Sequence, residues 1–167
     1  MFAYPERAGE AVIGAGAPRG RNDWDRMRHP VVVAADEPAP SYDEAFGDLA
    51  HAYLEDSWVL GISQSASALI FTLDLVLTPT HPAFRPPRPN EMHCYRRATM
   101  RLDSESPIQI HRSSAPPAVD ATGEMDYGNI DTFRPIDGAA SITWELTGEW
   151  GTARVTHPRV RIEFQDV

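Results

Sequence analysis

The chain of 167 residues contains no lysine, and all 15 of its basic residues are arginine. Without lysine, it can form no lysine Schiff base and hold no nucleotide through a Walker-type lysine, so both kinds of site are excluded. Acidic residues outnumber the arginines and give a formal net charge of −9. Proteins that bind duplex nucleic acid need clustered positive charge, so we expect no nucleic-acid partner.

Cysteine and long apolar runs are also scarce. Cys94 is the only cysteine, so no disulfide can form within the chain, which fits a reducing cytoplasm. No run approaches the roughly 18 apolar residues of a membrane span, and the first residues lack the basic stretch and apolar segment of a secretory signal. We therefore expect a soluble, cytoplasmic protein that does not enter a membrane.

Residues 1–40 show little periodicity and are rich in glycine, alanine, proline and arginine. We expect a poorly structured leader, or an edge strand at 31–34, followed by a single β-rich domain over residues 41–167. Glycines 14, 16 and 20 are spaced GxGxxxG rather than GxGxxG, and the polar segment after them is too short for a crossover helix. A dinucleotide site is therefore disfavoured, and we expect no cofactor.

A helix is predicted over residues 41–54. Ser41 and Glu44 match the S-x-x-E capping box that begins many helices. The apolar residues that follow recur at helical spacing and share one face. They are Tyr42, Ala45, Phe46, Leu49, Ala50, Tyr53 and Leu54. Such a stripe predicts an amphipathic helix packed against a sheet.

From residue 57 onward apolar and polar residues alternate, which indicates strands. The residues predicted to face the core are Trp58, Leu60, Ile62, Leu69, Phe71, Leu73, Leu75, Leu77, Met92, Cys94, Ala98, Met100, Leu102, Ile108, Ile110, Ile142, Trp144, Leu146, Ala153, Val155, Val160, Ile162 and Phe164. Consecutive short strands pair antiparallel, so we expect a mainly β fold: an antiparallel sandwich or partly open barrel of about six or seven strands. Residues 113–137 are predicted to form a polar loop with little regular structure.

The segment "HPAFRPPRPNEMHCYRR", residues 81–97, concentrates unusual residues. Its prolines exclude helix and ladder hydrogen bonds, so the first part is predicted to be a stiff, extended loop. A stiff loop that carries Arg85 and Arg88 suits the docking of a partner, and it equally suits a rigid connection between strands. In the strand that follows, alternation places Tyr95 and Arg97 on the outward face.

The same segment offers a weak set of metal ligands. Glu91 and His93 are two residues apart and point the same way on a strand, and His81 at the head of the loop supplies a third group. Such a set suits zinc or a similar ion. The spacing matches no dedicated motif, and half-exposed residues of these types mostly face solvent or pair with one another. Cys94 is expected to be a small buried hydrophobe.

A second polar segment is "GEMDYGNID", residues 123–131. It lacks the residue order of a calcium-binding loop, and its residue types also build turns, which we expect here. Arg96 interrupts the apolar alternation of the preceding strand, so it lies at a bulge or needs a buried partner. We predict that this loop folds over residues 91–97, with Arg96 or Arg97 bonded to Glu124, Asp126 or Asp131. This would gather His93, Tyr95 and Tyr127 in one polar patch.

No nucleophile elbow of the form GxSxG occurs, and no cysteine–histidine signature surrounds Cys94. The sequence therefore nominates no catalytic residue, and whether the chain is an enzyme stays open. At "LIFTLDLVL", "HPAFRPP", "EMHCYRR", "GEMDYGNID" and "GEWGTARV", the chain resembles small β-rich bacterial proteins, some of which are similar to immunity proteins of toxin systems. The resemblance covers roughly residues 50–167.

Two functional hypotheses follow. The first, of the immunity-protein kind, is a non-enzymatic, cytoplasmic domain that binds another protein; small size, acidity, a polar loop-rich surface and the missing catalytic motif favour it. The alternative is a β-barrel, either an enzyme or a simple binder of a small ligand or metal, with a polar site around Glu91, His93 and Asp126. The predicted ligand or partner patch consists of His81, Arg85, Glu91, His93, Tyr95, Arg96, Arg97, Asp126 and Tyr127.

Overall fold

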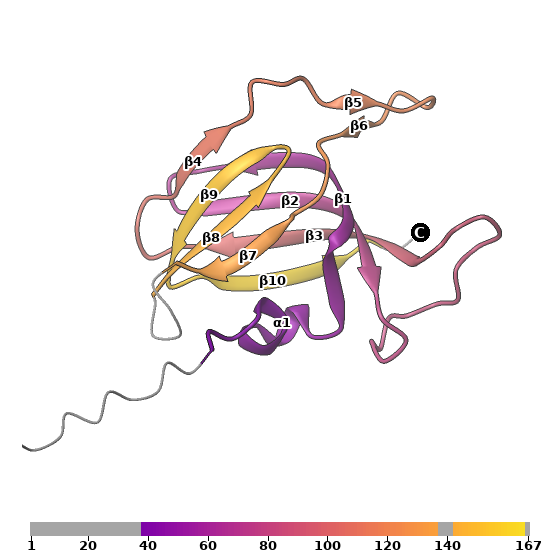
Figure 1. Ribbon diagram of the computed structural model, residues 1–167, viewed down its shortest axis with the longest axis horizontal. Helices are drawn as coiled ribbons and strands as arrows, with labels where there is room; N and C mark the ends of the chain where they lie inside the picture. The colour runs from indigo at the N-terminus through magenta and orange to yellow at the C-terminus, as the bar shows by residue number, and fades with distance from the viewer. Residues whose placement is uncertain (1–37, 137–141, 166–167) are drawn as a thin grey trace, which may run out of the picture. The chain divides into compact units, whose positions relative to one another are not determined.

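The computed structural model describes residues 38–136 and 142–165 (Figure 1). They form a one-turn helix α1 (Tyr42–Ala45), a 3-10 turn η2 (Gly47–Leu49) and ten strands. The strands are β1 (Ala52–Gln64), β2 (Ala68–Leu77), β3 (Cys94–Asp103), β4 (Gln109–Arg112), β5 (Ala118–Val119), β6 (Met125–Asp126), β7 (Thr132–Pro135), β8 (Thr143–Gly148), β9 (Gly151–Thr156) and β10 (Arg159–Phe164). The predictions for residues 1–37, including the edge strand at 31–34, lie outside the described residues.

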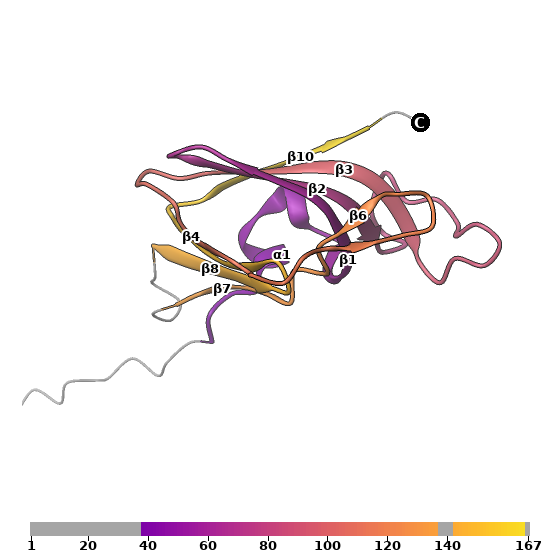
Figure 2. The same ribbon diagram turned by 90° about the horizontal axis from the view of Figure 1, so that it is seen from above.

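The strands form two antiparallel sheets of four strands, in the orders β1-β2-β3-β10 and β4-β9-β8-β7. Seen from above, the two sheets lie in two layers (Figure 2). β5 and β6 pair as a separate two-stranded ribbon. The predicted mainly β, antiparallel fold is confirmed. Within the described residues the sheets do not close into a barrel, and the ten strands exceed the six or seven predicted.

The core lies between the two sheets. The five inward-facing residues predicted on β2, from Leu69 to Leu77, are all buried, as are Ala98, Met100 and Leu102 of β3. They meet the buried side chains of β8 and β9, and Phe71 packs edge-on against Trp150 with ring centroids 5.0 Å apart. Uninterrupted alternation in long strands therefore predicted the core correctly, because the side chains of a strand point to opposite faces in turn.

The prediction for β1 was wrong in part. Trp58 was expected to face the core, yet its side chain is 42% exposed, whereas Val59 is fully buried. The pairing of β1 with β2 is irregular between Tyr53 and Trp58 and again between Val59 and Gly61. A bulge adds one residue to a strand, and a shift of one residue exchanges the two faces.

Two other residues predicted to face the core lie just outside a strand. Met92 is 85% exposed because β3 begins at Cys94, and Met92 still belongs to the loop before it. Ile142 is 52% exposed and precedes β8, which begins at Thr143. The alternation predicted both strands correctly but began each of them one or two residues too early.

The predicted helix over residues 41–54 is also wrong. The capping box is present, with the Ser41 N–H donating to Glu44 Oε2 at 3.1 Å, but α1 ends at Ala45 and the chain becomes extended at Phe46. Phe46 stacks on Phe133 at 5.1 Å between ring centroids and meets Trp144 edge-on at 4.7 Å. Gly47 is a poor helix residue, so packing of these rings outweighs helix propensity. Of the predicted stripe, Tyr42 and Leu49 are buried but Ala45 and Tyr53 are exposed. α1 lies beside β10 at the side of the core (Figure 1).

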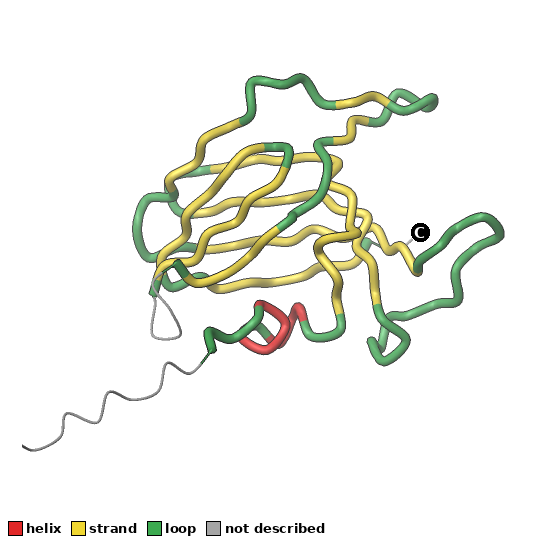
Figure 3. The backbone as a smooth tube through the Cα atoms, in the orientation of Figure 1, coloured by secondary structure: helices red, strands yellow, loops and turns green. Residues whose placement is uncertain are grey.

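The region predicted as an irregular polar loop contains three strands. β5 and β6 are two residues each, and the long loops around them dominate this part of the chain (Figure 3). β7 is a full member of the second sheet and contributes Phe133 to the core, while Ile130 just before it is fully buried. Strands of two to four residues contain too few side chains to display an alternation.

Both edges of the first sheet are covered in part by other segments. The N–H and carbonyl of Val59 on β1 bond to Gly128 O and Tyr127 N, each at 2.8 Å. At the other edge, the outward N–H of Ile162 on β10 donates to Asp48 Oδ2 at 3.1 Å. Among the described residues, helices reach neither the length nor the hydropathy that crossing a membrane requires.

Candidate functional site

The loop between β2 and β3, residues 78–93, is braced by hydrogen bonds from its backbone N–H groups to side chains; we call it the proline loop. Arg85 N–H donates to Cys94 Sγ at 3.2 Å, and Arg88 N–H donates to Glu91 Oε2 at 2.9 Å. The prolines fix further backbone angles. The loop therefore holds one shape although it extends beyond the end of the sheet (Figure 3).

A groove of about 520 Å³ lies between the proline loop and the adjoining ends of β2, β3 and β10. Its lining includes four arginines and only two acidic residues. The lining residues are Asp74, Arg85, Pro86, Arg88, Glu91, Cys94, Tyr95, Arg96, Arg97 and Gln165. Most of the patch predicted from the sequence lies here: Arg85, Glu91, Tyr95, Arg96 and Arg97 line the groove, and His81 and His93 belong to the proline loop.

Arg97 joins three parts of the chain. Its Nε donates to Asp74 Oδ1 at 2.8 Å, and one terminal nitrogen donates to Glu124 Oε1 at 2.7 Å. The other terminal nitrogen reaches both carboxylates, at 3.3 and 3.1 Å. These hydrogen bonds with Asp74 and Glu124 raise the pKa of Arg97 above its already high ordinary value. The predicted bond between this strand end and the loop of residues 123–131 is confirmed.

Arg96 behaves differently from both predictions for it. The pairing of β3 with β2 runs through Arg96 without a break, so there is no bulge at this position. Its guanidinium donates to the Ala83 carbonyl at 2.9 Å and lies 5.6 Å from the centre of the Phe164 ring. A carbonyl and an aromatic face therefore stabilise this cation in place of a carboxylate. The contact also fastens the proline loop to the sheet.

Arg85 and Arg88 use only their backbones in the fold. Within the described residues, neither guanidinium takes part in a hydrogen bond or an ion pair. Both side chains are exposed. A guanidinium has five N–H donors in a fixed fork that matches carboxylate or phosphate oxygens. These two side chains are therefore the groove's unsatisfied cations.

The three metal candidates do not form a site. Among residues 38–136 and 142–165, no three His, Cys, Asp or Glu side chains are placed to hold one ion. His81 packs edge-on against Phe164, Glu91 accepts from the loop backbone, and His93 Nε2 lies 3.8 Å from Asp56 Oδ2. The three side chains are not grouped because β3 begins only after Glu91 and His93, which do not share a strand face.

His81 instead helps to shape the proline loop. Its Nδ1 accepts a hydrogen bond from the Ala83 N–H at 3.0 Å, so this nitrogen carries no proton there. Burial lowers the pKa of His81, and the neighbouring His51 and Arg96 lower it further. The neutral imidazole is thus the form that fits the folded loop.

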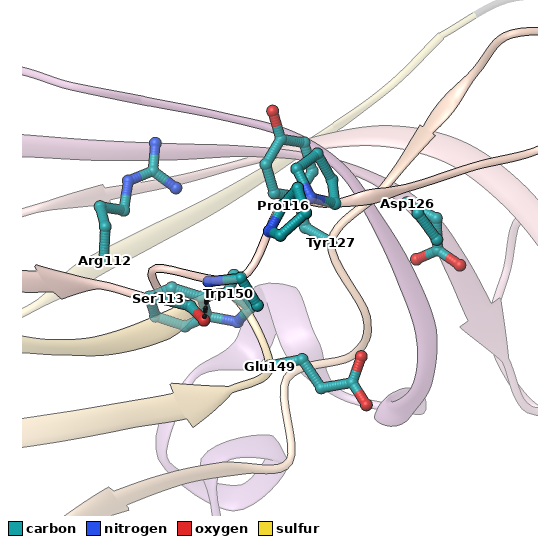
Figure 4. A pocket seen from close by; sticks show the side chains of 10 residues that line it. Arg112, Ser113, Pro116, Asp126, Tyr127, Glu149 and Trp150 are labelled. Carbon is teal, nitrogen blue, oxygen red and sulfur yellow. Dashed lines mark hydrogen bonds between the residues drawn. The ribbon is translucent and has the colours of Figure 1, made fainter.

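Asp126 and Tyr127, also predicted for the patch, line a different cavity of about 330 Å³ (Figure 4). Asp126 Oδ1 accepts from the Gly128 N–H at 2.8 Å, which is a turn contact, as the sequence predicted. Trp150 lies in the wall of this cavity, and Ser113 N–H donates to its carbonyl at 2.9 Å. The single polar patch around His93, Tyr95 and Tyr127 is therefore divided between two places.

This second cavity had no counterpart among the sequence predictions. Arg112, Glu149 and Trp150 line it from β4 and from the β8–β9 turn, where "GEWG" indicated only a tight connection. Trp150 Nε1 is buried without a hydrogen-bond partner among the described residues. A Cβ atom added to Gly148 would lie 2.5 Å from this nitrogen. The indole N–H therefore packs directly against the backbone of Gly148. The cavity thus combines an aromatic wall with the polar side chains of Arg112 and Glu149.

The chemistry available at the groove is the binding of oxyanions. Arg96, Arg97, Asp74 and Glu91 already have partners within the fold. The guanidiniums of Arg85 and Arg88 do not, and they suit bidentate hydrogen bonds to an anion. Comparison of the chain with known protein families, with characterised proteins and with solved structures finds no match.

Proposed function

We propose that the chain is a non-enzymatic domain that binds another protein through the proline loop and the groove beneath it. One observation carries this proposal: a loop braced by its own hydrogen bonds presents two exposed guanidiniums, those of Arg85 and Arg88, that serve no contact within the described fold. Surface cations with no structural role at the mouth of a groove suit recognition of a partner.

The physical properties of the loop support this role. A recognition loop that is ordered before binding loses less conformational entropy when the partner arrives. Arginine, tyrosine and methionine are enriched at protein interfaces. Tyr95 lines the groove, and Met92 on the proline loop is 85% exposed. The surface therefore combines a stiff scaffold with residue types that contribute strongly to binding.

The proposal also covers the kind of partner and a location in the cytoplasm. The resemblance to immunity proteins favours a partner whose activity is blocked when this surface covers it. The single unpaired Cys94 is buried and accepts a hydrogen bond from the loop backbone, which fits a reducing cytoplasm.

A random-peptide library displayed on phage tests the proposal, and it requires no identified partner. Selection on the wild-type chain should enrich peptides that no longer bind the double variant Arg85→Ala, Arg88→Ala. A matched control removes two exposed arginines of β10 outside the groove, Arg159→Ala and Arg161→Ala. Enriched peptides that bind both double variants as well as wild type, or a selection that enriches nothing, would reject the proline loop as the recognition surface.

A further inference from the structure

We propose that the groove binds an acidic segment of a protein partner, with carboxylates of that segment paired to Arg85 and Arg88. This inference rests on the proposed function, since it takes the proline loop as the recognition surface. It adds the chemistry of what that surface recognises.

Three of the chain's other arginines are bonded to carboxylates of the fold. Arg97, Arg101 and Arg154 each pair with a carboxylate of the fold at 2.7–2.8 Å. A chain with net charge −9 has an ample supply of such partners. Arg85 and Arg88 nevertheless line a shared groove with no carboxylate bonded to either guanidinium among the described residues. Two cations left free in one groove favour an external anion.

The groove also favours a segment over a single ion. Its volume of about 520 Å³ lies in the range of roughly 300–1,000 Å³ typical of ligand sites. One carboxylate or phosphate group would fill little of it. Tyr95 and Pro86 supply apolar lining between the charged side chains, which suits the backbone and stems of a peptide.

The two free guanidiniums favour two carboxylates over one phosphate group. Asp74 and Glu91 line the same groove as the four arginines. Arg97 is neutralised by Asp74 and Glu124, so the net positive charge that remains is small. A phosphate monoester places nearly two negative charges on one group, which a single guanidinium does not neutralise. Two carboxylates spaced along a peptide match two separate guanidiniums.

The test compares two synthetic peptides that differ only in charge. The first places glutamates between serine and glycine spacers, and the second replaces each glutamate with glutamine. We expect wild-type protein to bind the glutamate peptide at least about tenfold more tightly, the scale of one charge-assisted hydrogen bond. Added salt should reduce that preference, because exposed charges are screened. Fluorescence anisotropy of labelled peptides measures both effects.

Variants assign the effect to the two residues. Arg85→Ala with Arg88→Ala should remove the preference for glutamate, whereas Arg159→Ala with Arg161→Ala, which removes the same charge elsewhere, should retain it. Arg85→Lys with Arg88→Lys should bind with intermediate affinity, because lysine keeps the charge and loses the fork. Equal loss in both alanine pairs would mean non-specific attraction and would overturn the inference.

Three further outcomes would reject this inference, and the first of them leaves the proposed function standing. Selected peptides that depend on Arg85 and Arg88 but show no preference for acidic residues would leave the protein-binding role standing and reject the acidic segment. A phosphoserine peptide that binds more tightly than the glutamate peptide would reject carboxylate as the preferred group. Glutamate and glutamine peptides of equal affinity would reject recognition of charge altogether.

Discussion

The end of β3 and the proline loop beside it each carry two arginines and use them in opposite ways. The guanidiniums of Arg96 and Arg97 on the strand are bonded to the fold, through a carbonyl and an aromatic ring in one case and two carboxylates in the other. Arg85 and Arg88 on the loop contribute only backbone N–H groups. The contrast separates arginines that hold the structure from arginines available to a partner, and substitution at each position tests it.

The largest effect is expected at Arg97. The variant Arg97→Ala leaves Asp74 and Glu124 close together without their shared cation. Because these groups are partly exposed, we expect a loss of about 1–2 kcal/mol in the free energy of unfolding, measured by urea denaturation. In the control, Glu124→Gln should cost less, since Arg97 keeps Asp74. Stability equal to wild type would show that the bridge contributes nothing.

A smaller loss is expected at Arg96. The variant Arg96→Ala removes a hydrogen bond to Ala83 and a cation–π contact with Phe164, together worth about 1 kcal/mol. The proline loop should also be cleaved faster in limited proteolysis, because this contact fastens it to the sheet. Unchanged cleavage would indicate that the loop's own hydrogen bonds suffice to hold it.

A pH-dependent effect smaller than either substitution is expected from His81. Its pKa in the folded chain is lowered by burial and by His51 and Arg96, so below about pH 6.5, the ordinary pKa of histidine, the unfolded chain takes up a proton that the folded chain does not. Stability should therefore fall as the pH drops below that value toward the folded pKa, and be unaffected by this group above neutrality. The variant His81→Gln should lose this part of the pH dependence in thermal melts; an identical profile would contradict the assignment.

The smallest effect on stability is expected for the loop arginines. The double variant Arg85→Ala, Arg88→Ala removes only exposed groups without partners in the described fold, so its free energy of unfolding should stay within about 0.5 kcal/mol of wild type. Urea denaturation beside Arg97→Ala makes the comparison direct. A loss as large as that of Arg97→Ala would mean that these side chains belong to the fold, and the contrast would disappear.

The sequence predicted the parts of the fold in which one physical rule acts over many residues. The inward face of β2 was predicted because five apolar residues alternate without interruption. The helix over residues 41–54 was predicted wrongly, because the spacing of Tyr42, Phe46 and Leu49 fits a helix and also fits a turn that packs three side chains on a core. A bulge such as the one near Val59 depends on the partner strand and leaves no mark in the pattern.

The candidate site, like the fold, was predicted only in part. The need for a carboxylate near Arg96 or Arg97 followed from charge alone, and Glu124 supplies it. Asp74 was missed as the second partner, because it lies opposite Arg97 only in the register of β2 and β3. His81, Glu91 and His93 are not brought together for a related reason: the first residue of β3 decides which side chains share a face.

The contacts on the two outer strands of the first sheet limit how the molecule can associate. Exposed strand edges are sites where other chains add strands and where aggregation begins. On β1, Val59 already exchanges hydrogen bonds with residues 127–128, and on β10 the carboxylate of Asp48 occupies the N–H of Ile162. An incoming strand would have to displace these groups or bury the Asp48 charge beside its own carbonyls. These contacts oppose fibre growth at both edge strands of the sheet, β1 and β10. The proline loop stays accessible to a partner.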